Sequence, residues 1–161
     1  MQIKVREEIM TIRKANKKDI GRINEICKEG LIKEHTLQNF GKNNRKIKED
    51  VEYDFNFHKK TISKNIKDRK QYWIVLEENN KIIGFGSAYI KGNKGVTESI
   101  YIAKEFRGKG YGSEILKKLI RWINSKKVKH IETNILTGNE PSIKLHEKFR
   151  FKPYLLRMRL K

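Results

Sequence analysis

Alternating and helical patterns of apolar residues predict helices in the first part of the chain and strands after them. Residues 10–14 alternate as a short strand does, and residues 16–19 look like a capped helix start with an acid at the third helical position. The apolar residues that follow fall on one helical stripe: Ile20, Ile23, Cys27 and Leu31. This stripe predicts a helix that ends near His35.

A polar stretch over residues 36–46 predicts a loop, and we expect a second helix over 47–67. The helical pattern of this segment is poor, because Tyr53, Phe55 and Phe57 alternate as they would in a strand. Of the segments in the chain, this one fits its assigned element least well.

Three strands joined as a meander are predicted next. Residues 71–76 and 82–90 are rich in β-branched and aromatic side chains, and Glu-Asn-Asn-Lys at 78–81 is a hairpin turn signal between them. A second turn at 92–95 leads to a third strand over 96–103.

After the meander, helical and strand patterns alternate. We expect a helix over 110–125, a strand over 130–136, a helix over 139–148 and a final strand near 153–160. Strands joined through a helix imply a parallel crossover, so the sheet is mixed. The predicted fold class is therefore α/β (α+β), with a mixed, mostly antiparallel central sheet and flanking helices.

Length and composition fit one domain. With 161 residues, two prolines and no Gly/Ser-rich linker, the chain reads as a single domain over 10–161 after an N-terminal extension over 1–9. Its longest apolar runs are a few residues, whereas a membrane-spanning helix needs about 20. Residues 1–11 lack the continuous apolar core of a signal peptide, so we expect a cytoplasmic protein without a membrane partner.

Cysteine and histidine usage argues against a metal site. The single cysteine, Cys27, excludes an internal disulfide and a cysteine-rich zinc site, and it lies in a helical apolar stripe. The four histidines are widely spaced and show no HExxH-like pairing, so no metal is expected.

The formal net charge of +19 attracts polyanions such as nucleic acid, ribosomes, anionic membranes or a phosphorylated cofactor. The lysines are spread along the whole chain, however, so a lysine-rich solvated surface explains them equally well. No helix gathers basic residues on one face and no aromatic–basic RNA signature is present, which argues against nucleic acid as a partner.

Three glycines in five residues lie at the start of the helix predicted over 110–125. Gly108, Gly110 and Gly112 lie where the first N–H groups of a helix have no intrahelical partner and the helix dipole is positive. Such a turn can hold a phosphate, and Arg107 and Lys109 add positive charge beside it. The Walker pattern is absent, and the glycine spacing is one residue short of the dinucleotide-binding pattern GxGxxG. The alternative explanation is that the glycines only allow the strand to turn tightly into the helix.

A second motif opens the helix predicted over 139–148, where Asn139 can cap the helix and Pro141 is tolerated in the first turn. On these two motifs the sequence resembles the GNAT superfamily of N-acetyltransferases. The family motifs (R/Q)-x-x-G-x-(G/A) and N-x-x-(A/S)-x-x-L-(Y/H) match Arg107, Gly110, Gly112, Asn139, Ser142, Leu145 and His146. Residues 99–102 and 142–148 are most similar to the phosphinothricin acetyltransferase branch.

The resemblance implies a GNAT-like acyl-CoA fold and an acetyl-CoA-dependent acetyltransferase, with coenzyme A as the cofactor. The diphosphate would bind the amides over 107–113, and the edge of the strand over 100–102 would pair with the amides of pantetheine. The implied cofactor-binding residues are Ile100, Tyr101, Ile102, Arg107, Gly108, Lys109, Gly110, Tyr111, Gly112, Ser113, Asn139 and Ser142.

Direct acetyl transfer needs a base for the acceptor amine and a proton for the departing thiolate. An alkylamine costs about 4–5 kcal/mol to deprotonate at pH 7, so we expect a base or a water chain to one. Glu98, on the strand that leads into the glycine turn, is the candidate base, and its two-residue period predicts that it shares a face with Ile100 and Ile102. His146 stands where the family usually has a tyrosine as proton donor, and histidine can also donate.

Tyr101 and Tyr111 are alternative candidates for these catalytic roles. The chain departs from the family pattern at Phe149-Arg150-Phe151, where the family usually reads LGF. Arg150 thus replaces a glycine at a position expected to need an unusual backbone angle.

The function favoured by the sequence is transfer of an acetyl group from acetyl-CoA to a primary amine of a small molecule or amino acid. One alternative is a protein or peptide N-acetyltransferase that docks on an acidic macromolecule, and another is a basic nucleic-acid-binding module. The acceptor pocket is expected between the first two helices and the connection over 36–67, and the protein is expected to be a monomer or a homodimer.

Overall fold

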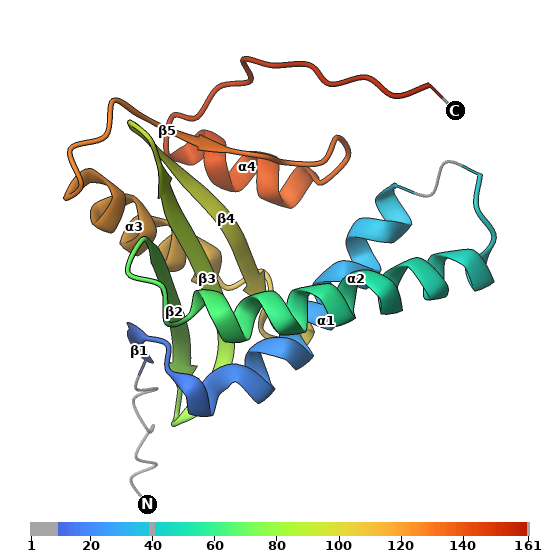
Figure 1. Cartoon of the computed structure of the whole chain (residues 1–161), viewed down its shortest axis with the longest axis horizontal. Helices are drawn as coiled ribbons and strands as arrows, with labels where there is room; N and C mark the ends of the chain where they lie inside the picture. Colours follow the sequence, from blue (N-terminus) through green and yellow to red (C-terminus); the bar gives the residue numbers. More distant parts are fainter. Residues whose placement is uncertain (1–9, 39–40, 161) are drawn as a thin grey trace, which may run out of the picture.

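A five-stranded sheet forms the centre of the protein, with helices on both faces (Figure 1). The structure is a computed structural model that describes residues 10–38 and 41–160, so the extension expected over 1–9 lies outside the described residues. The strands are β1 (Met10–Lys14), β2 (Gln71–Glu78), β3 (Lys81–Lys91), β4 (Lys94–Ile102) and β5 (His130–Thr133). The helices are α1 (Ile20–Leu37), α2 (Asn44–Asn65), α3 (Tyr111–Asn124) and α4 (Glu140–Lys148), with short 3-10 turns at Lys17–Asp19 and Lys104–Phe106.

The strand order is β1-β2-β3-β4-β5, and the pairing confirms the predicted mixed sheet. The first three neighbouring pairs are antiparallel, while β4 and β5 are parallel and are connected through α3. Asn79 and Asn80 turn β2 into β3 with φ angles of 50° and 65°, the left-handed backbone that a two-residue hairpin requires and that asparagine tolerates. The meander predicted from the sequence is therefore confirmed.

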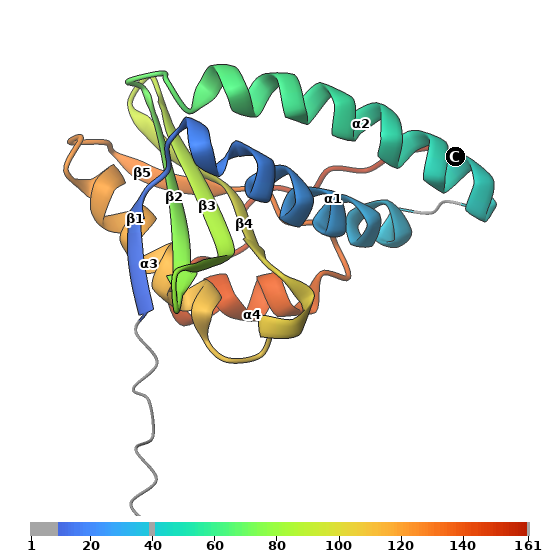
Figure 2. The ribbon, with the colours of Figure 1, turned by 90° about the horizontal axis from the view of Figure 1, so that it is seen from below.

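The alternation of side chains along the strands divides the core into two layers. Trp73 and Val75 face the layer under α1 and α2, whereas Ile74 and Leu76 face the layer under α3. Figure 2 shows α1 and α2 on one side of the sheet and α3 and α4 on the other. Cys27 is buried in the first layer, and burial raises the pKa of its thiol to about 12.

Helix α2 confirms the second predicted helix but begins three residues earlier, where the Asn43 side chain accepts a hydrogen bond from the Lys46 amide. Its weak periodicity has a structural cause. The helix packs along α1 and buries little beyond Val51 and Ile62, so Tyr53 and Phe57 are left exposed. Because only a narrow face of α2 is buried, its aromatic residues are free to alternate along the sequence as they would in a strand.

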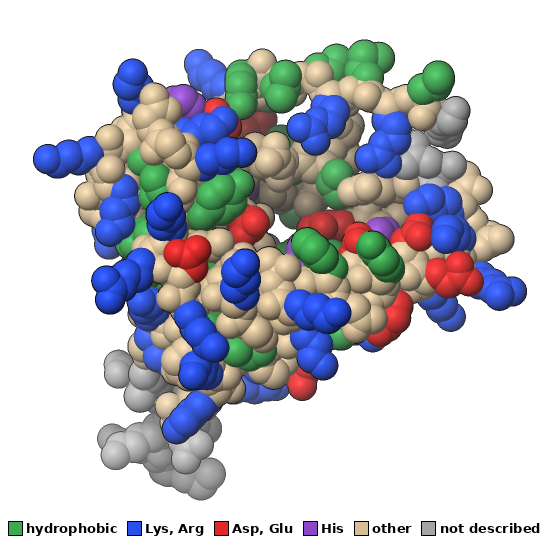
Figure 3. All heavy atoms as spheres, in the orientation of Figure 1, with side chains coloured by type: hydrophobic (Ala, Val, Ile, Leu, Met, Phe, Trp, Pro, Cys, Tyr) green, Lys and Arg blue, Asp and Glu red, His purple; other side chains and the backbone are tan. Residues whose placement is uncertain are grey.

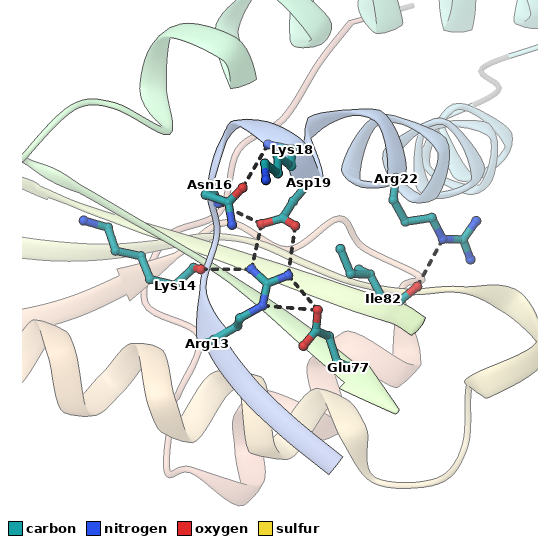
Figure 4. Close-up of polar contacts among 8 residues, drawn as sticks. All are labelled: Arg13, Lys14, Asn16, Lys18, Asp19, Arg22, Glu77 and Ile82. Atoms are coloured by element: carbon teal, nitrogen blue, oxygen red, sulfur yellow. Dashed lines mark hydrogen bonds and ion pairs between the residues drawn. The ribbon is translucent and has the colours of Figure 1, made fainter. Parts of the chain in front are cut away.

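The entry to α1 is held by an arginine from the first strand (Figure 4). The Arg13 guanidinium donates to both carboxylate oxygens of Asp19, at 2.8 and 2.9 Å, and to Glu77 on β2 at 2.6 Å. Asp19 also accepts from the Asn16 amide at 2.8 Å, which with the Asn16 side chain completes a capping box. The hydrogen bonds from Arg13, aided by the Asn16 amide, hold the pKa of Asp19 below its ordinary value. The predicted capped helix start is confirmed.

Helix α4 ends at a residue with a left-handed backbone, as expected at a position where the family usually has a glycine. Arg150 has a φ of 66°, its amide donates to the Glu147 carbonyl at 2.9 Å, and the Phe151 amide donates to the His146 carbonyl at 3.2 Å. This pair of bonds is a Schellman motif, and the Phe151 ring packs edge-on against His146 with centroids 5.2 Å apart.

The prediction of a strand near 153–160 is wrong, because residues 151–160 form an extended segment outside the sheet. The segment runs from α4 in the direction of the start of α2 (Figure 1). Its apolar side chains are exposed, with Leu156 at 78% and Leu160 at 97%. Alternation of apolar and basic residues gave the right local pattern for a strand, but a strand also needs a neighbouring backbone to pair with.

Candidate active site

A cavity of about 730 Å³ opens between β4, α1, the beginning of α3 and helix α4. Figure 3 shows this face hollowed between α4 and the C-terminal segment on one side and α2 on the other. Nearly all residues predicted for the site line this cavity: Glu98, Ile100, Tyr101, Ile102, Arg107, Gly108, Gly110, Tyr111, Gly112, Ser113, Asn139, Ser142 and His146. Lys109 is the exception, since its ammonium lies over the Phe106 ring at 5.5 Å and it is not part of the lining.

The glycine turn takes the backbone shape that the sequence predicts. Gly108 and Gly110 have φ angles of 83° and 86°, and Gly110 is the N-cap of α3. No atom of the described residues lies within 4 Å of a Cβ placed at either position, so glycine is needed for the backbone angle and the space beside it is open. The amide of Ser113 donates to the Gly110 carbonyl at 2.9 Å, and that of Arg107 to the Lys104 carbonyl at 3.4 Å. Both of these amides are therefore engaged, while the space beside Gly108 and Gly110 between them is open.

The edge of β4 turns toward the cavity after its first residues. Register with β5 runs only from Lys94 to Thr97, whereas β4 continues to pair with β3 as far as Ile102. Beyond Thr97, within the described residues, one edge of β4 has no strand beside it, so an extended amide ligand could add there. One acceptor on this strand is already engaged, because Arg107 Nε donates to the Ile102 carbonyl at 2.8 Å.

Glu98 occupies a β-bulge, and this corrects the face predicted for it. Ser87 pairs with Ser99 while the next residue, Ala88, pairs with Thr97, so Glu98 is an extra residue in β4. Ile100 and Ile102 pack in the layer under α3. Glu98 instead lines a small cavity together with Trp73 and Phe85, on the α1 and α2 side of the sheet. The two-residue period fails here because a bulge shifts the alternation by one residue.

The surroundings of Glu98 suit a proton acceptor. Its carboxylate accepts a hydrogen bond from the Ser87 hydroxyl at 3.2 Å. The side chain reaches solvent through the open cavity, yet enough protein surrounds it for desolvation to raise its pKa, against smaller lowering effects of Ser87 and His58. A carboxylate with a raised pKa holds a proton more readily near neutral pH.

His58 on α2 lines both the large and the small cavity and was not identified from the sequence. The sequence does indicate the position of His58 once residues 44–65 are known to form a helix. Val51, Phe55, His58 and Ile62 are spaced as one helical stripe, and Val51 and Ile62 are buried. A histidine on a stripe that otherwise holds core residues must point toward α1 and the sheet.

His146 lines the cavity but does not present a proton to it. Its Nδ1 lies 2.8 Å from the Ser142 carbonyl, so Nδ1 carries the proton and donates it there. Its Nε2 is buried and has no hydrogen-bond partner within residues 10–38 and 41–160. Burial lowers the pKa of His146, only partly opposed by the bond to Ser142, and therefore favours the neutral ring.

The two tyrosine hydroxyls are each bonded to a glutamate. Tyr101 donates to Glu34 on α1 at 2.5 Å, and Tyr111 donates to Glu78 on β2. Burial first, and the Glu34 carboxylate second, raise the pKa of Tyr101. The Tyr101 ring lies directly on Gly30, where a Cβ would come within 1.9 Å of the ring. Neither Gly30 nor Glu34 was singled out in the sequence, although a glycine inside a helical stripe often marks such a close approach.

Asn139 bridges the cavity and does not cap α4 with its side chain, contrary to the sequence prediction. Its Oδ1 accepts from the ammonium of Lys33 on α1 at 3.3 Å. The Asn139 carbonyl accepts the amides of Ser142 and Ile143, each at 3.0 Å, so its backbone still begins the helix. The Asn139 side chain thus connects the start of α4 to α1, a contact that the sequence pattern of a helix start does not predict.

The fold and the two motifs define a member of an acetyltransferase family. Residues 32–151 match the acetyltransferase (GNAT) family, and the chain therefore belongs to this family. Among curated proteins, it is similar to the SPbeta prophage-derived uncharacterized N-acetyltransferase YokL of Bacillus subtilis, with 30% identity over 82 residues. That match covers 49% of this chain and 46% of the relative, so it spans less than half the length of the relative.

Solved structures of acetyltransferases share the fold. Aminoglycoside N-acetyltransferase AAC(6')-Iy in complex with CoA aligns with a TM-score of 0.68 and 17% identity over 99% of this chain and 98% of that one. PaiA N-acetyltransferase from Thermoplasma acidophilum, in complex with coenzyme A, gives 0.73 and 16% over 88% of both chains. The putative acetyltransferase YycN from Bacillus subtilis gives 0.73 and 14% over 95% and 98%. These matches confirm the predicted fold class.

The described residues contain neither a membrane-spanning helix nor a group of metal-binding side chains. None of the helices there is both long and apolar enough to span a bilayer. In the same part of the chain, no three His, Cys, Asp or Glu side chains are grouped as a metal site would require.

Proposed function

We propose that the protein is an acetyl-CoA-dependent N-acetyltransferase that moves an acetyl group directly to a primary amine of a small molecule or amino acid. The observation that carries the proposal is a single cavity onto which the glycine turn, the unpaired edge of β4 and the Glu98 carboxylate all open. Membership of the family supports the class of reaction.

The residues of the cavity fit coenzyme A. The backbone around Gly108 and Gly110 would hold the diphosphate, since both angles are left-handed and the space beside them is open. The free edge of β4 over 100–102 would bind the pantetheine amides. When bound, acetyl-CoA supplies an activated acetyl thioester. Similar structures in complex with CoA support this assignment.

Glu98 is the proposed base. An acceptor amine arrives protonated at neutral pH, and the Glu98 carboxylate would take that proton directly or through one water. The raised pKa of Glu98 brings it closer to the pKa of the amine, and the Ser87 hydroxyl holds the carboxylate in place at 3.2 Å. The deprotonated amine is then positioned to attack the thioester carbonyl.

His146 is the proposed proton donor to the departing thiolate. The departing thiolate would take the Nδ1 proton of the neutral ring, and the attacking nitrogen, which loses a second proton as the amide forms, would supply its replacement. In the resting structure, however, Nδ1 is engaged by Ser142 and Nε2 is enclosed, so the ring must turn before it can donate. His146→Gln and His146→Phe test this role, because both remove the proton while Gln retains hydrogen-bonding groups.

A protein or peptide acceptor is the second candidate, favoured by the net charge of +19. Figure 3 argues against a dedicated docking patch on the face it shows, because the Lys and Arg side chains there are scattered over many elements. Salt distinguishes the two acceptors: a steep loss of activity with ionic strength supports a docked macromolecule, and salt-independent turnover supports a small amine. The nucleic-acid-binding alternative is disfavoured by membership of the acetyltransferase family.

The similarity to the phosphinothricin acetyltransferase branch, the cytoplasmic location and the monomeric or dimeric state stay predictions of the sequence. The decisive experiment for the function is cofactor binding followed by turnover. Acetyl-CoA at millimolar concentration should raise the melting temperature, and an amine should then accelerate release of free thiol. Absence of any thermal shift with both acetyl-CoA and CoA would remove the basis of the proposal.

A further inference from the structure

A second, smaller cavity of about 100 Å³ adjoins the large one on the α2 side of the sheet. Four residues line both cavities: His58, Glu98, Ser99 and Tyr101. The small cavity is therefore a side pocket whose opening lies at the proposed base. None of its lining residues belongs to the glycine turn, so the proposed diphosphate site does not use it.

The side pocket has an apolar floor and a polar rim. Trp73 and Phe85 stack on one another with ring centroids 6.0 Å apart and are 4% and 1% exposed. Cys27 and Ile62 complete the buried floor. Polar groups occur at the opening, where Glu98 reaches solvent, and on the α2 wall, where Thr61 and Asn65 line the pocket. The Trp73 indole N–H already donates to Gln71 at 3.2 Å. The floor therefore favours hydrocarbon, while the rim favours a cation.

We propose that this side pocket holds the apolar part of the acceptor, so that the acceptor is a primary amine carrying an aliphatic group of about three to five carbons. The inference rests on the proposed function, because it places the acceptor nitrogen beside Glu98. Cavity size limits the group, since a cavity of about 150 Å³ holds benzene and this one is smaller. A hydroxyl-rich amino sugar fits poorly, because its hydroxyls would lose hydrogen bonds with water on the Trp73 and Phe85 floor.

Turnover of a graded series of amines tests the size and polarity of the acceptor. The series contains methylamine, n-propylamine, isobutylamine, n-octylamine and a polyamino sugar. We expect kcat/KM to rise about fourfold for each added methylene up to four or five carbons and then to stop rising. The polyamino sugar should be a poorer acceptor than isobutylamine.

A matched pair of variants on α2 assigns the effect to the side pocket. Thr61 lines the pocket and its hydroxyl donates to the Phe57 carbonyl at 3.0 Å. Ser63 makes the same kind of bond to the Lys59 carbonyl at 3.2 Å but lines neither cavity. In the unaltered protein we expect kcat/KM to be at least tenfold higher for isobutylamine than for methylamine. Thr61→Leu fills the pocket and should abolish this difference, whereas Ser63→Leu should retain it.

Direct binding to the protein without cofactor provides a readout independent of turnover. The chain has two tryptophans, and Trp122 stacks on Tyr72 in the other core layer. In a Trp122→Phe background the fluorescence reports Trp73 alone. Isobutylamine should change this fluorescence saturably, methylamine should change it much less, and Thr61→Leu should remove the response.

The outcomes separate the inference from the proposed function. Turnover that is indifferent to chain length, a preference for the polyamino sugar, or no fluorescence response to isobutylamine would overturn the side-pocket proposal while leaving the acetyltransferase intact. Failure of acetyl-CoA to stabilise the protein would overturn the function, yet a saturable Trp73 response would still show an apolar amine site.

Discussion

Replacement of Arg150 by glycine should stabilise the protein, because this residue is held in a backbone conformation that costs any side chain with a Cβ. Its φ of 66° ends helix α4, and both hydrogen bonds of the Schellman motif are made by backbone atoms alone. The Arg150 side chain is exposed, so its removal exposes no core. Arg150→Gly therefore removes the strain and retains the motif.

The magnitude follows from two opposing effects. A left-handed conformation costs a non-glycine residue roughly 1–2 kcal/mol. Glycine loses more freedom on folding, which offsets roughly 0.5–1 kcal/mol of the gain. The net expectation is an increase of about 0.5–1 kcal/mol in the free energy of unfolding, or about 1–4 °C in Tm for a chain of this size.

Urea unfolding of the purified protein, with thermal unfolding in parallel, measures the change. Arg150→Ala is the matched control: it removes the same charge but keeps the Cβ, so we expect no comparable gain. Lys127, with a φ of 56°, offers a second left-handed position for the same comparison. If Arg150→Ala stabilises as much as Arg150→Gly, the effect comes from charge and the backbone explanation is refuted.

Three further predictions address the cofactor turn, the base and the entry to α1. Gly110→Ala should abolish the thermal shift with CoA, whereas Gly92→Ala, also left-handed but outside the cavity, should cost similar stability and keep the shift; equal loss in both would refute the assignment. Glu98→Gln should lower kcat about 10²–10⁴-fold and remove the acidic limb of the pH–rate profile. In the unaltered protein this limb should lie at a higher pH than an ordinary carboxyl would give, because the pKa of Glu98 is raised. Asp19→Asn should cost about 1–3 kcal/mol at neutral pH. Because Arg13 lowers the Asp19 pKa, this contribution is present above the unfolded pKa and fades as pH falls through the folded value; a difference that persists in acid contradicts it.

The order of elements up to α4 and the glycine turn could be predicted because they depend on near neighbours. Hydrophobic stripes predicted α1 and α3, and Asn79-Asn80 predicted a hairpin that the backbone angles confirm. The left-handed residue at the end of α4 was also predictable, since an arginine stands where the family has a glycine. Each of these features depends on residues within a few positions of one another.

The surroundings of Glu98, the proposed base, were not predictable in the same way. The face of Glu98 depends on a bulge, and a bulge depends on how β3 and β4 come into register. His58 could be placed only after α2 was known to be a helix packed on α1, and the Tyr101 hydroxyl reaches Glu34 from 67 positions away. The bulge at Glu98 and the contact of Tyr101 with Glu34 have no local signature, and the helical stripe that contains His58 can be read only once the segment is known to be a helix.

The sequence by itself determined the family motifs, the class of fold and the backbone shape of the glycine turn, because these require only short spacings and the special freedom of glycine. The tertiary structure alone decided which side chains line the small cavity beside Glu98 and that the C-terminal segment is no strand. The physical reason is that periodicity describes what a segment can become, whereas pairing and burial depend on which distant segments lie beside it.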